Sequence, residues 1–250
     1  MARRRRPGRS ALSRVVLVTG GTRGLGRGIA SAFVDAGDRV VVCGRNPGDG
    51  PGRFVPCDVR DPEAVDVLVA DVMAAEGRLD VVVNNAGGTP WGLVAESSPR
   101  LAERVVALNL LAPLYVARAA RLVMDTGVIL NIGSVSARRP SPGTAAYSAA
   151  KAGLTMLTRA LALEWSPAVR VNQVTVGLLD TERTSQTYGE DLAAVETTVP
   201  MGRLAAPADV AAACLMLASP ALSYVTGADL FVDGGGEVPA YYQARGGDHG

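Results

Sequence analysis

The chain has 250 residues, a formal net charge of +1 at pH 7, and a composition that is 48% hydrophobic but only 4% aromatic. This length admits one large α/β domain or two small ones, and a core of Val, Leu, Ile and Ala suits buried strands covered by helices. A charge so close to zero gives no overall attraction to nucleic acid or to acidic lipid. We therefore expect neither of them as a partner.

The chain begins with a basic segment, because five of its first ten residues are arginines. We expect residues 1–12 to be a disordered, solvated leader, with a nucleic-acid-binding arm as the alternative. No apolar stretch follows it, so it is no secretory signal. The later apolar stretch at 108–124 is interrupted by Asn109, Pro113 and two arginines, so we expect no membrane span and a cytoplasmic location.

Short β-branched runs then alternate with segments of helical periodicity. The expected strands are 15–19, 39–43, 54–57, 80–84, 128–132, 169–174 and 229–232, and the expected helices are 24–36, 62–76, 99–123, 145–165 and 208–217. Neighbouring parallel strands are joined by right-handed crossovers, which the helical segments can provide. The strands of a parallel sheet are buried on both faces and therefore apolar along their length, as the expected strands are here. The sequence thus predicts one α/β domain over 13–235. It is a Rossmann-type doubly wound parallel sheet of about seven strands, with helices on both faces.

Two segments depart from this alternation. Residues 181–206 lack a clean period, which predicts a mobile substrate lid, with an ordinary surface connection as an equal alternative. The tail at 236–250 is rich in glycine but carries Tyr241 and Tyr242, so it is either frayed or docked on a neighbouring subunit.

A glycine-rich turn joins the first strand to the first helix. Glycines there let backbone N–H groups and the positive end of a helix approach a pyrophosphate, because no Cβ intervenes. The turn predicts a dinucleotide site, with contacts from Gly20, Thr22, Arg23, Gly24, Leu25 and Gly26.

The end of the second strand bears on the choice of cofactor. Folds that prefer NADH usually carry an acid there, to bond the ribose 2′-hydroxyl. This chain has Arg45 instead, and with Arg23 it predicts a clamp for the 2′-phosphate of NADP(H). If both arginines are merely solvated, an NAD(H)-dependent enzyme is the alternative.

Cysteine and histidine are too sparse for several other chemistries. The three cysteines, Cys43, Cys57 and Cys214, are irregularly spaced, and the single histidine is the penultimate residue. These counts disfavour a disulfide framework, a metal site and a histidine-dependent serine hydrolase. We expect no metal.

Lys151 is the only lysine of the chain and lies four residues after Tyr147 in an Ala-rich helical segment, so both side chains share a helix face. A tyrosine with its usual pKa near 10 is a poor acid or base at neutral pH, and a nearby ammonium favours the phenolate. The spacing therefore predicts a proton-transfer pair. Taken in isolation, a surface Tyr/Lys pair is the alternative.

With the glycine turn before it, this pair resembles the classical short-chain dehydrogenase/reductase family. The family's other landmarks follow in order: Asn84-Asn85-Ala86-Gly87 after the fourth strand, Ser134 after the fifth, and Phe231-Val232-Asp233-Gly234-Gly235 at the closing strand. The resemblance covers about residues 13–235, and NADPH-dependent ketoreductases and 3-oxoacyl-[acyl-carrier-protein] reductases are the members it most resembles.

The resemblance implies a role for each catalytic residue. Tyr147 would be the general acid/base, and Lys151 would lower its pKa and bind the nicotinamide ribose. Ser134 would orient the carbonyl, and Asn109 would hold a water that links Lys151 to solvent. Further cofactor contacts are implied at Asp58, Val59, Asn85, Ala86, Gly87, Ile132, Gly177, Leu179 and Thr181.

One position departs from the family pattern, which usually reads Pro-Gly before the lid where this chain has Val176-Gly177. Valine keeps its N–H and has no fixed φ, so we expect a looser or differently bonded turn. We do not expect the change to abolish cofactor binding.

The substrate is left open among 3-oxoacyl thioesters, polyketide ketones, steroids, sugars and simple ketones. Thr89, Trp91, Leu93 and the 181–206 segment are the expected substrate wall. Arg138 and Arg139 are expected to be solvated, with docking of an acyl-carrier phosphopantetheine as the alternative.

The predicted function is hydride transfer between NADP(H) and a small carbonyl compound or secondary alcohol. The alternatives are an NAD(H)-dependent alcohol dehydrogenase of the same family and a non-catalytic dinucleotide-binding regulator. The segments 99–123 and 145–165 carry more apolar residues than one sheet face should cover, and the family commonly pairs such helices. We therefore expect a homotetramer, or at least a dimer.

Overall fold

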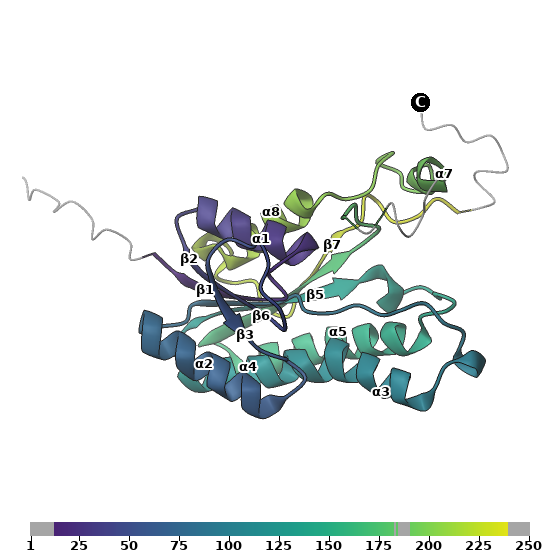
Figure 1. The fold of residues 1–250 in the computed structure, drawn as a ribbon. Helices are drawn as coiled ribbons and strands as arrows, with labels where there is room; N and C mark the ends of the chain where they lie inside the picture. The colour runs from purple at the N-terminus through teal and green to yellow at the C-terminus, as the bar shows by residue number, and fades with distance from the viewer. Residues whose placement is uncertain (1–12, 183, 185–190, 240–250) are drawn as a thin grey trace, which may run out of the picture.

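A computed structural model of the chain describes residues 13–182, 184 and 191–239 (Figure 1). The expected leader, the tail with Tyr241 and Tyr242, and part of the expected lid lie outside the described residues.

The described chain forms one seven-stranded sheet in the order β3-β2-β1-β4-β5-β6-β7, with every neighbouring pair parallel. The strands are β1 (Val15–Thr19), β2 (Arg39–Gly44), β3 (Arg53–Pro56), β4 (Val81–Asn84), β5 (Gly127–Ser134), β6 (Val169–Val176) and β7 (Asp229–Val232). The chain builds outward from β1 to β3 and then returns to place β4 on the other side of β1. This reversal is a topological switch point, where open α/β sheets bind ligands. The predicted single Rossmann-type domain is confirmed.

Helices cover both faces of the sheet (Figure 1). On one face lie α1 (Gly24–Asp35) and α8 (Pro207–Ala218), and on the other α2 (Pro62–Glu76), α3 (Pro99–Val106), α4 (Ala112–Val123) and α5 (Ala145–Trp165). A short helix, α7 (Leu192–Glu196), lies in the expected lid.

The bounds of α2 show how local chemistry sets an element. The Asp61 side chain caps the helix by accepting from the N–H groups of Glu63 and Ala64, and Pro62 supplies a φ suited to the first turn. Gly77 ends the helix in the left-handed region at φ 75°. These bounds match the expected helix.

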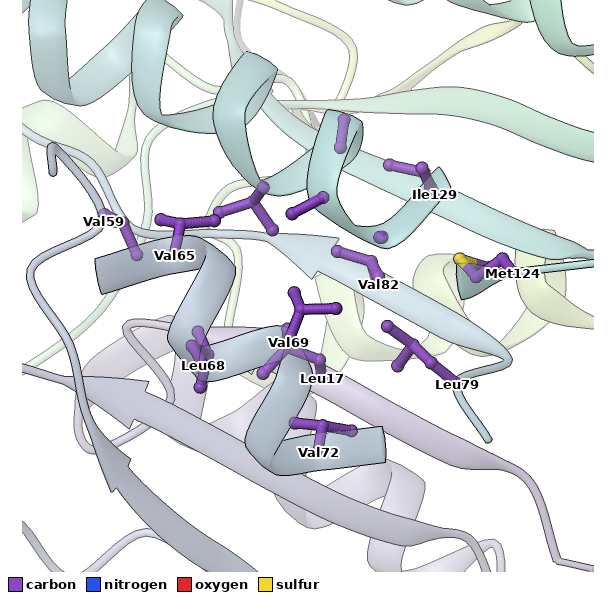
Figure 2. Packing of buried hydrophobic residues seen from close by; sticks show 14 of the residues in the cluster. Leu17, Val59, Val65, Leu68, Val69, Val72, Leu79, Val82, Met124 and Ile129 are labelled. Carbon is purple, nitrogen blue, oxygen red and sulfur yellow. The ribbon is translucent and has the colours of Figure 1, made fainter. Parts of the chain in front are cut away.

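Apolar side chains form a hydrophobic cluster on each side of the sheet. Figure 2 shows the cluster beneath α2, where Val65, Leu68 and Val69 of the helix meet Leu17 of β1 and Val82 of β4. Neighbouring strand residues point to opposite faces, so Val16 and Val18 join the cluster under α1 and α8. Continuous valine runs therefore supply both cores.

The expected helix at 99–123 is not one regular α-helix. Residues Ala107–Leu111 form a π-helical turn between α3 and α4. Pro113 has no N–H to donate to the carbonyl of Asn109 four residues earlier, which opens the helix at this point. The Asn109 amide donates at 2.8 Å to the carbonyl of Val105, one turn earlier in the chain.

By length and composition the whole stretch Pro99–Val123 could cross a membrane, with a mean hydropathy of 1.4 in its most apolar window. In this fold α4 instead buries one face against the sheet and α2, through Ala112, Pro113, Val116, Ala117, Ala119 and Ala120. That is the pattern of a core helix. Leu122 on α4 and Leu163 on α5 remain exposed, and self-association through these helices stays a prediction.

Polar side chains tie the centre of the sheet to α5. Asn84 Nδ2 donates to Asn131 Oδ1 at 2.9 Å, and Asn131 Nδ2 donates to Thr158 Oγ1 at 2.9 Å. All three residues are buried, so each bond replaces one that water would otherwise provide.

Asn131→Ala should therefore lower the free energy of unfolding by about 2–4 kcal/mol, because it removes two buried hydrogen bonds and leaves a cavity. Val67→Ala on the exposed face of α2 is the control, with an expected change within about 0.5 kcal/mol. Urea unfolding measures both. Equal midpoints for Asn131→Ala and wild type would show that this chain of bonds stabilises nothing.

Candidate active site

A cavity of about 960 Å³ lies at the carboxyl ends of the central strands. Its volume is within the range of sites for small ligands. Its wall contains all the predicted cofactor and catalytic residues except Asn109, namely Gly20, Thr22, Arg23, Gly24, Leu25, Gly26, Arg45, Asp58, Val59, Asn85, Ala86, Gly87, Ile132, Ser134, Tyr147, Lys151, Gly177, Leu179 and Thr181.

The glycine turn forms one end of this cavity and is packed too tightly for side chains. Gly20 has φ 64°, and a Cβ on Gly26 would lie 2.2 Å from the Gly20 carbonyl oxygen and 2.4 Å from Asn85 Nδ2. A Cβ on Gly24 would meet no atom within 4 Å, so this position faces open space. The turn thus presents bare backbone to the cavity.

Asn85 braces the turn against β4. Its Nδ2 donates to the carbonyls of Thr19 at 2.9 Å and Gly20 at 3.2 Å. In return, the Thr19 hydroxyl accepts from the backbone N–H groups of Asn85 and Ala86, both at 3.0 Å. Thr19 was missed at the sequence level, because a threonine ending a strand carries no distinctive signal.

These residues fit a dinucleotide. Helix α1 begins at Gly24 with Arg23 as its N-cap, and no side chain caps its first N–H groups. Uncapped N–H groups and the helix dipole together favour an anion such as a pyrophosphate.

The other end of the cavity holds the predicted reacting groups. Ser134 ends β5, and Tyr147 and Lys151 come from the first two turns of α5. Tyr147 forms a hydrogen bond with Ser134. Lys151 Nζ lies 5.7 Å from the centre of the Tyr147 ring and donates to the Ile132 carbonyl at 2.7 Å.

Burial controls the protonation of this pair. It raises the pKa of Tyr147, with the hydrogen bond from Ser134 acting in the opposite direction. It lowers the pKa of Lys151 to about 8. The sequence predicted that the nearby ammonium lowers the tyrosine pKa, and for the protein alone the structure gives the opposite direction. In the protein alone, desolvation dominates and Tyr147 is a protonated phenol.

Asn109 occupies a different place from the other predicted catalytic residues. Its side chain is buried, with Oδ1 accepting from the Gly88 N–H and Nδ2 donating to the Gly88 carbonyl, each at 2.9 Å. The second amide hydrogen is used by Val105. Both amide hydrogens are therefore committed, and the side chain braces the segment after β4. The expected water would have to be held by the backbone carbonyl of Asn109 or by Oδ1.

Arginines surround the predicted adenosine end. Arg27 pairs with Glu182, and Arg60 pairs with Asp58, whose pKa it lowers. Two more arginines, Arg23 and Arg45, line this part of the cavity wall. Both are exposed, and neither forms a salt bridge with another described residue. These two are the predicted phosphate ligands.

The loop at 45–52 joins β2 to β3 without a helix, although they are parallel neighbours. It packs directly on the glycine turn: a Cβ on Gly48 would lie 2.6 Å from the Thr22 carbonyl oxygen, and one on Gly50 would lie 2.5 Å from that of Gly21. The loop also brings Asp49 to the cavity wall, a carboxylate that sequence analysis missed.

The comparisons with known proteins agree with this site. A family model described as "Enoyl-(Acyl carrier protein) reductase" matches residues 20–237. The chain is 38% identical to L-fucose dehydrogenase of Bos taurus over 90% of each chain. It is 36% identical to the 3-oxoacyl-[acyl-carrier-protein] reductase FabG of Chlamydia muridarum, over 90% of this chain and 97% of the relative.

The protein belongs to the short-chain dehydrogenase/reductase family. Members of this family bind a nicotinamide dinucleotide. Among solved structures, the ligand-free aldohexose dehydrogenase of Thermoplasma acidophilum superposes with a TM-score of 0.86 at 32% identity, covering 89% of this chain and 93% of that one.

Val176, the position that departs from the family pattern, is the last residue of β6, which runs two residues beyond its expected end. Valine is compatible with a strand position because it keeps the N–H that proline lacks. The turn after it is held by bonds from Gly177 N to the Val232 carbonyl at 3.0 Å and from Asp180 N to the Ala205 carbonyl at 2.8 Å. These bonds fix the turn in place, and how it differs from the Pro-Gly turn of the family stays a prediction.

The expected substrate wall is only partly correct. Thr89, Trp91 and Leu93 are not among the cavity-lining residues, although Leu108, which was missed, is one. The Trp91 indole lies so close to Gly143 that a Cβ there would be 2.1 Å from Nε1. Its place is against the segment preceding α5, which periodicity cannot reveal.

The two arginines after Ser134 are exposed or partly exposed, and each also forms an ion pair that the sequence did not predict. Arg138 pairs with Asp229 at 3.2 Å, and Arg139 pairs with Glu237. Both bonds reach segments distant in sequence, so composition gave no sign of them.

Lys151→Met should stabilise the fold at neutral pH. The pKa of Lys151 is about 8 in the folded protein and 10.5 for the free side chain. While the lysine is protonated in both the folded and the unfolded state, this difference lowers the free energy of unfolding by about 3 kcal/mol. This cost is complete below pH 8 and is relieved as the pH rises from 8 to 10.5. The methionine side chain avoids it but forfeits the bond to Ile132, so we expect a net gain of about 1–3 kcal/mol at pH 7.

Urea unfolding at pH 7 and pH 9.5 tests this, with the advantage of the variant shrinking at the higher pH. If Lys151→Met is less stable than wild type at pH 7, burial of the lysine ammonium does not destabilise the fold, and the expectation is wrong.

Proposed function

We propose that this protein reduces the carbonyl group of a small compound to a secondary alcohol with NADPH. The observation that carries the proposal is the buried Tyr147, hydrogen-bonded to Ser134 and adjoining Lys151, in the same cavity as a glycine turn that fits a dinucleotide.

The residues would divide the work as follows. Ser134 holds the carbonyl oxygen, and the Tyr147 hydroxyl gives it a proton as the bond order falls. A bound nicotinamide supplies the hydride. Lys151 has one hydrogen bond among the described residues, to the Ile132 carbonyl, which leaves donors for ribose hydroxyls. Its positive charge stabilises the phenolate that forms when the proton leaves.

Burial raises the pKa of Tyr147 and keeps the phenol protonated, which is the form that donates a proton during reduction. A non-catalytic regulator would need the glycine turn but not this assembly. The arrangement of the three groups therefore supports an enzyme.

The ion pairs of Arg138 and Arg139 support a small soluble substrate over one carried on a protein. A phosphopantetheine phosphate would have to compete with a carboxylate for either guanidinium. A screen of ketones, aldoses and acyl thioesters, followed by the loss of NADPH absorbance, tests this choice. Turnover confined to carrier-bound thioesters would overturn it.

Tyr147→Phe should fold and bind NADPH but lose about 10²–10⁴-fold in kcat, because only the transferable proton is removed. The measurement is kcat on the best substrate of the screen, with cofactor affinity determined in parallel. Rates close to wild type would exclude the assigned role. Binding of NADPH by wild type with no turnover of any carbonyl would instead favour a regulator.

Arg45→Asp should weaken NADPH binding by about ten- to hundred-fold and leave NADH unaffected or improved. A charge-assisted bond to the 2′-phosphate contributes about 1.5–3 kcal/mol, and the substitution adds repulsion. Asp49→Asn on the same loop is the converse variant. It removes a negative charge from the cavity wall, so we expect it to strengthen NADPH binding relative to NADH. Titrations of both cofactors at one ionic strength decide this, since exposed phosphate contacts weaken with salt. An unchanged NADPH-to-NADH ratio in Arg45→Asp would show that Arg45 is a surface residue.

A further inference from the structure

A buried polar network lies behind the reacting groups. Gln173 is 0% exposed on β6, at a position where a parallel strand covered on both faces is normally apolar. Val171, on the same face of the strand, belongs to the hydrophobic core. Gln173 Nε2 lies within hydrogen-bond distance of three oxygens, at 2.9 Å from Thr155 Oγ1, 2.9 Å from Thr175 Oγ1 and 3.2 Å from Asp229 Oδ1.

One branch of the network runs to the loop after Ser134. The Thr175 hydroxyl donates to Asp229 Oδ1 at 2.5 Å, and Asp229 Oδ2 accepts from Arg138 at 3.2 Å. The Asp229 side chain is only 7% exposed, and the Arg138 guanidinium also lies 5.0 Å from the centre of the Phe231 ring. Arg138 follows the 3-10 turn that begins next to Ser134, so this pair fixes the turn against β7.

The other branch reaches Lys151. The Thr155 hydroxyl accepts from Gln173 and donates to the backbone carbonyl of Lys151 at 3.2 Å. The Gln173 amide also packs on the residue before Ser134: a Cβ on Gly133 would lie 2.7 Å from its Cδ and Nε2. A single side chain therefore abuts the strand that ends in the serine and is bonded to the helix that carries the lysine.

We infer that Gln173 and Thr155 are positioning residues, which fix Lys151 on α5 relative to Ser134 at the end of β5. Neither residue lines the cavity, so both act from behind the site. The consequence for turnover rests on the proposed function. Reactions between held groups are sensitive to displacements of about 1 Å, so loosening this link should lower kcat more than it alters binding.

Two substitutions at Thr155 separate positioning from packing. Thr155→Val keeps the shape and removes the hydroxyl, whereas Thr155→Ser keeps the hydroxyl and removes a methyl group. We expect Thr155→Val to lose about tenfold in kcat with KM for NADPH within about twofold, and Thr155→Ser to retain near-wild-type kcat. A packing role predicts the reverse order.

Gln173→Met, which keeps the length of the side chain, should have the same effect on kcat and KM as Thr155→Val. Val65→Ala in α2 is the control for a general loss of stability.

A second readout needs no turnover. Lys151 is the only lysine, so protein labelled with ¹³C at lysine Cε gives a single side-chain NMR signal. We expect that signal to move in Thr155→Val and Gln173→Met, and to stay in place in Thr155→Ser and Val65→Ala.

The two readouts keep the inferences distinct. If wild type reduces no carbonyl but the signal shifts as expected, the proposed function fails and the positioning inference stands. If wild type is active and both kcat and the signal are unchanged in Thr155→Val and Gln173→Met, the network has a structural role alone and the inference is wrong.

Discussion

The site depends on one constraint, which is that parallel strands deliver their carboxyl ends to a single edge of the sheet. At the switch point between β1 and β4 the connections leave in opposite directions, and a cavity opens between them. That opening would separate the two strand ends if nothing joined them. Thr19 and Asn85 join them through four hydrogen bonds of 2.9–3.2 Å. The glycine turn is therefore held against the neighbouring strand before any ligand binds, which is the preorganisation that phosphate binding needs.

The reacting end is held at a cost to stability. A buried ammonium with one carbonyl partner is an unfavourable group in a fold, as the lowered pKa of Lys151 shows. The same burial raises the pKa of Tyr147 and keeps its proton in place. Removing water thus disfavours the charged form of each residue, and it also strengthens any charge that a bound ligand brings. A stable core and a reactive pair therefore make opposite demands at this end of the cavity.

Apolar runs, glycine spacing and the lone lysine are local signals, and the family resemblance supplied the other predicted site residues. From these the sequence predicted the sheet, most of its helices and 19 of the 32 residues that line the cavity. It missed what depends on contacts between distant segments, such as the ion pair between Arg138 and Asp229 and the position of Trp91 against Gly143. Periodicity also hid the π-helical turn, although Pro113 lies four residues after Asn109 and signals the lost donor. The expected end of β6 at 174 was two residues short, because the strand continues past the polar Gln173 and through the polar Thr175 to Val176.

The polar residues Gln173 and Thr175 of β6 affect both the stability of the strand and the position of the reacting groups. A buried strand gains from apolar side chains on both faces, and Gln173 and Thr175 forgo that gain at the point where the strand approaches the cavity. Gln173 Nε2 and the Thr175 hydroxyl are held by partners within the described protein, whereas Gln173 Oε1 is buried there without a hydrogen-bond partner. Apolar packing tolerates small shifts, whereas a hydrogen bond near 2.9 Å does not. The change from valine to polar side chains along β6 therefore exchanges stability for a defined position, and it does so directly behind the serine and the lysine.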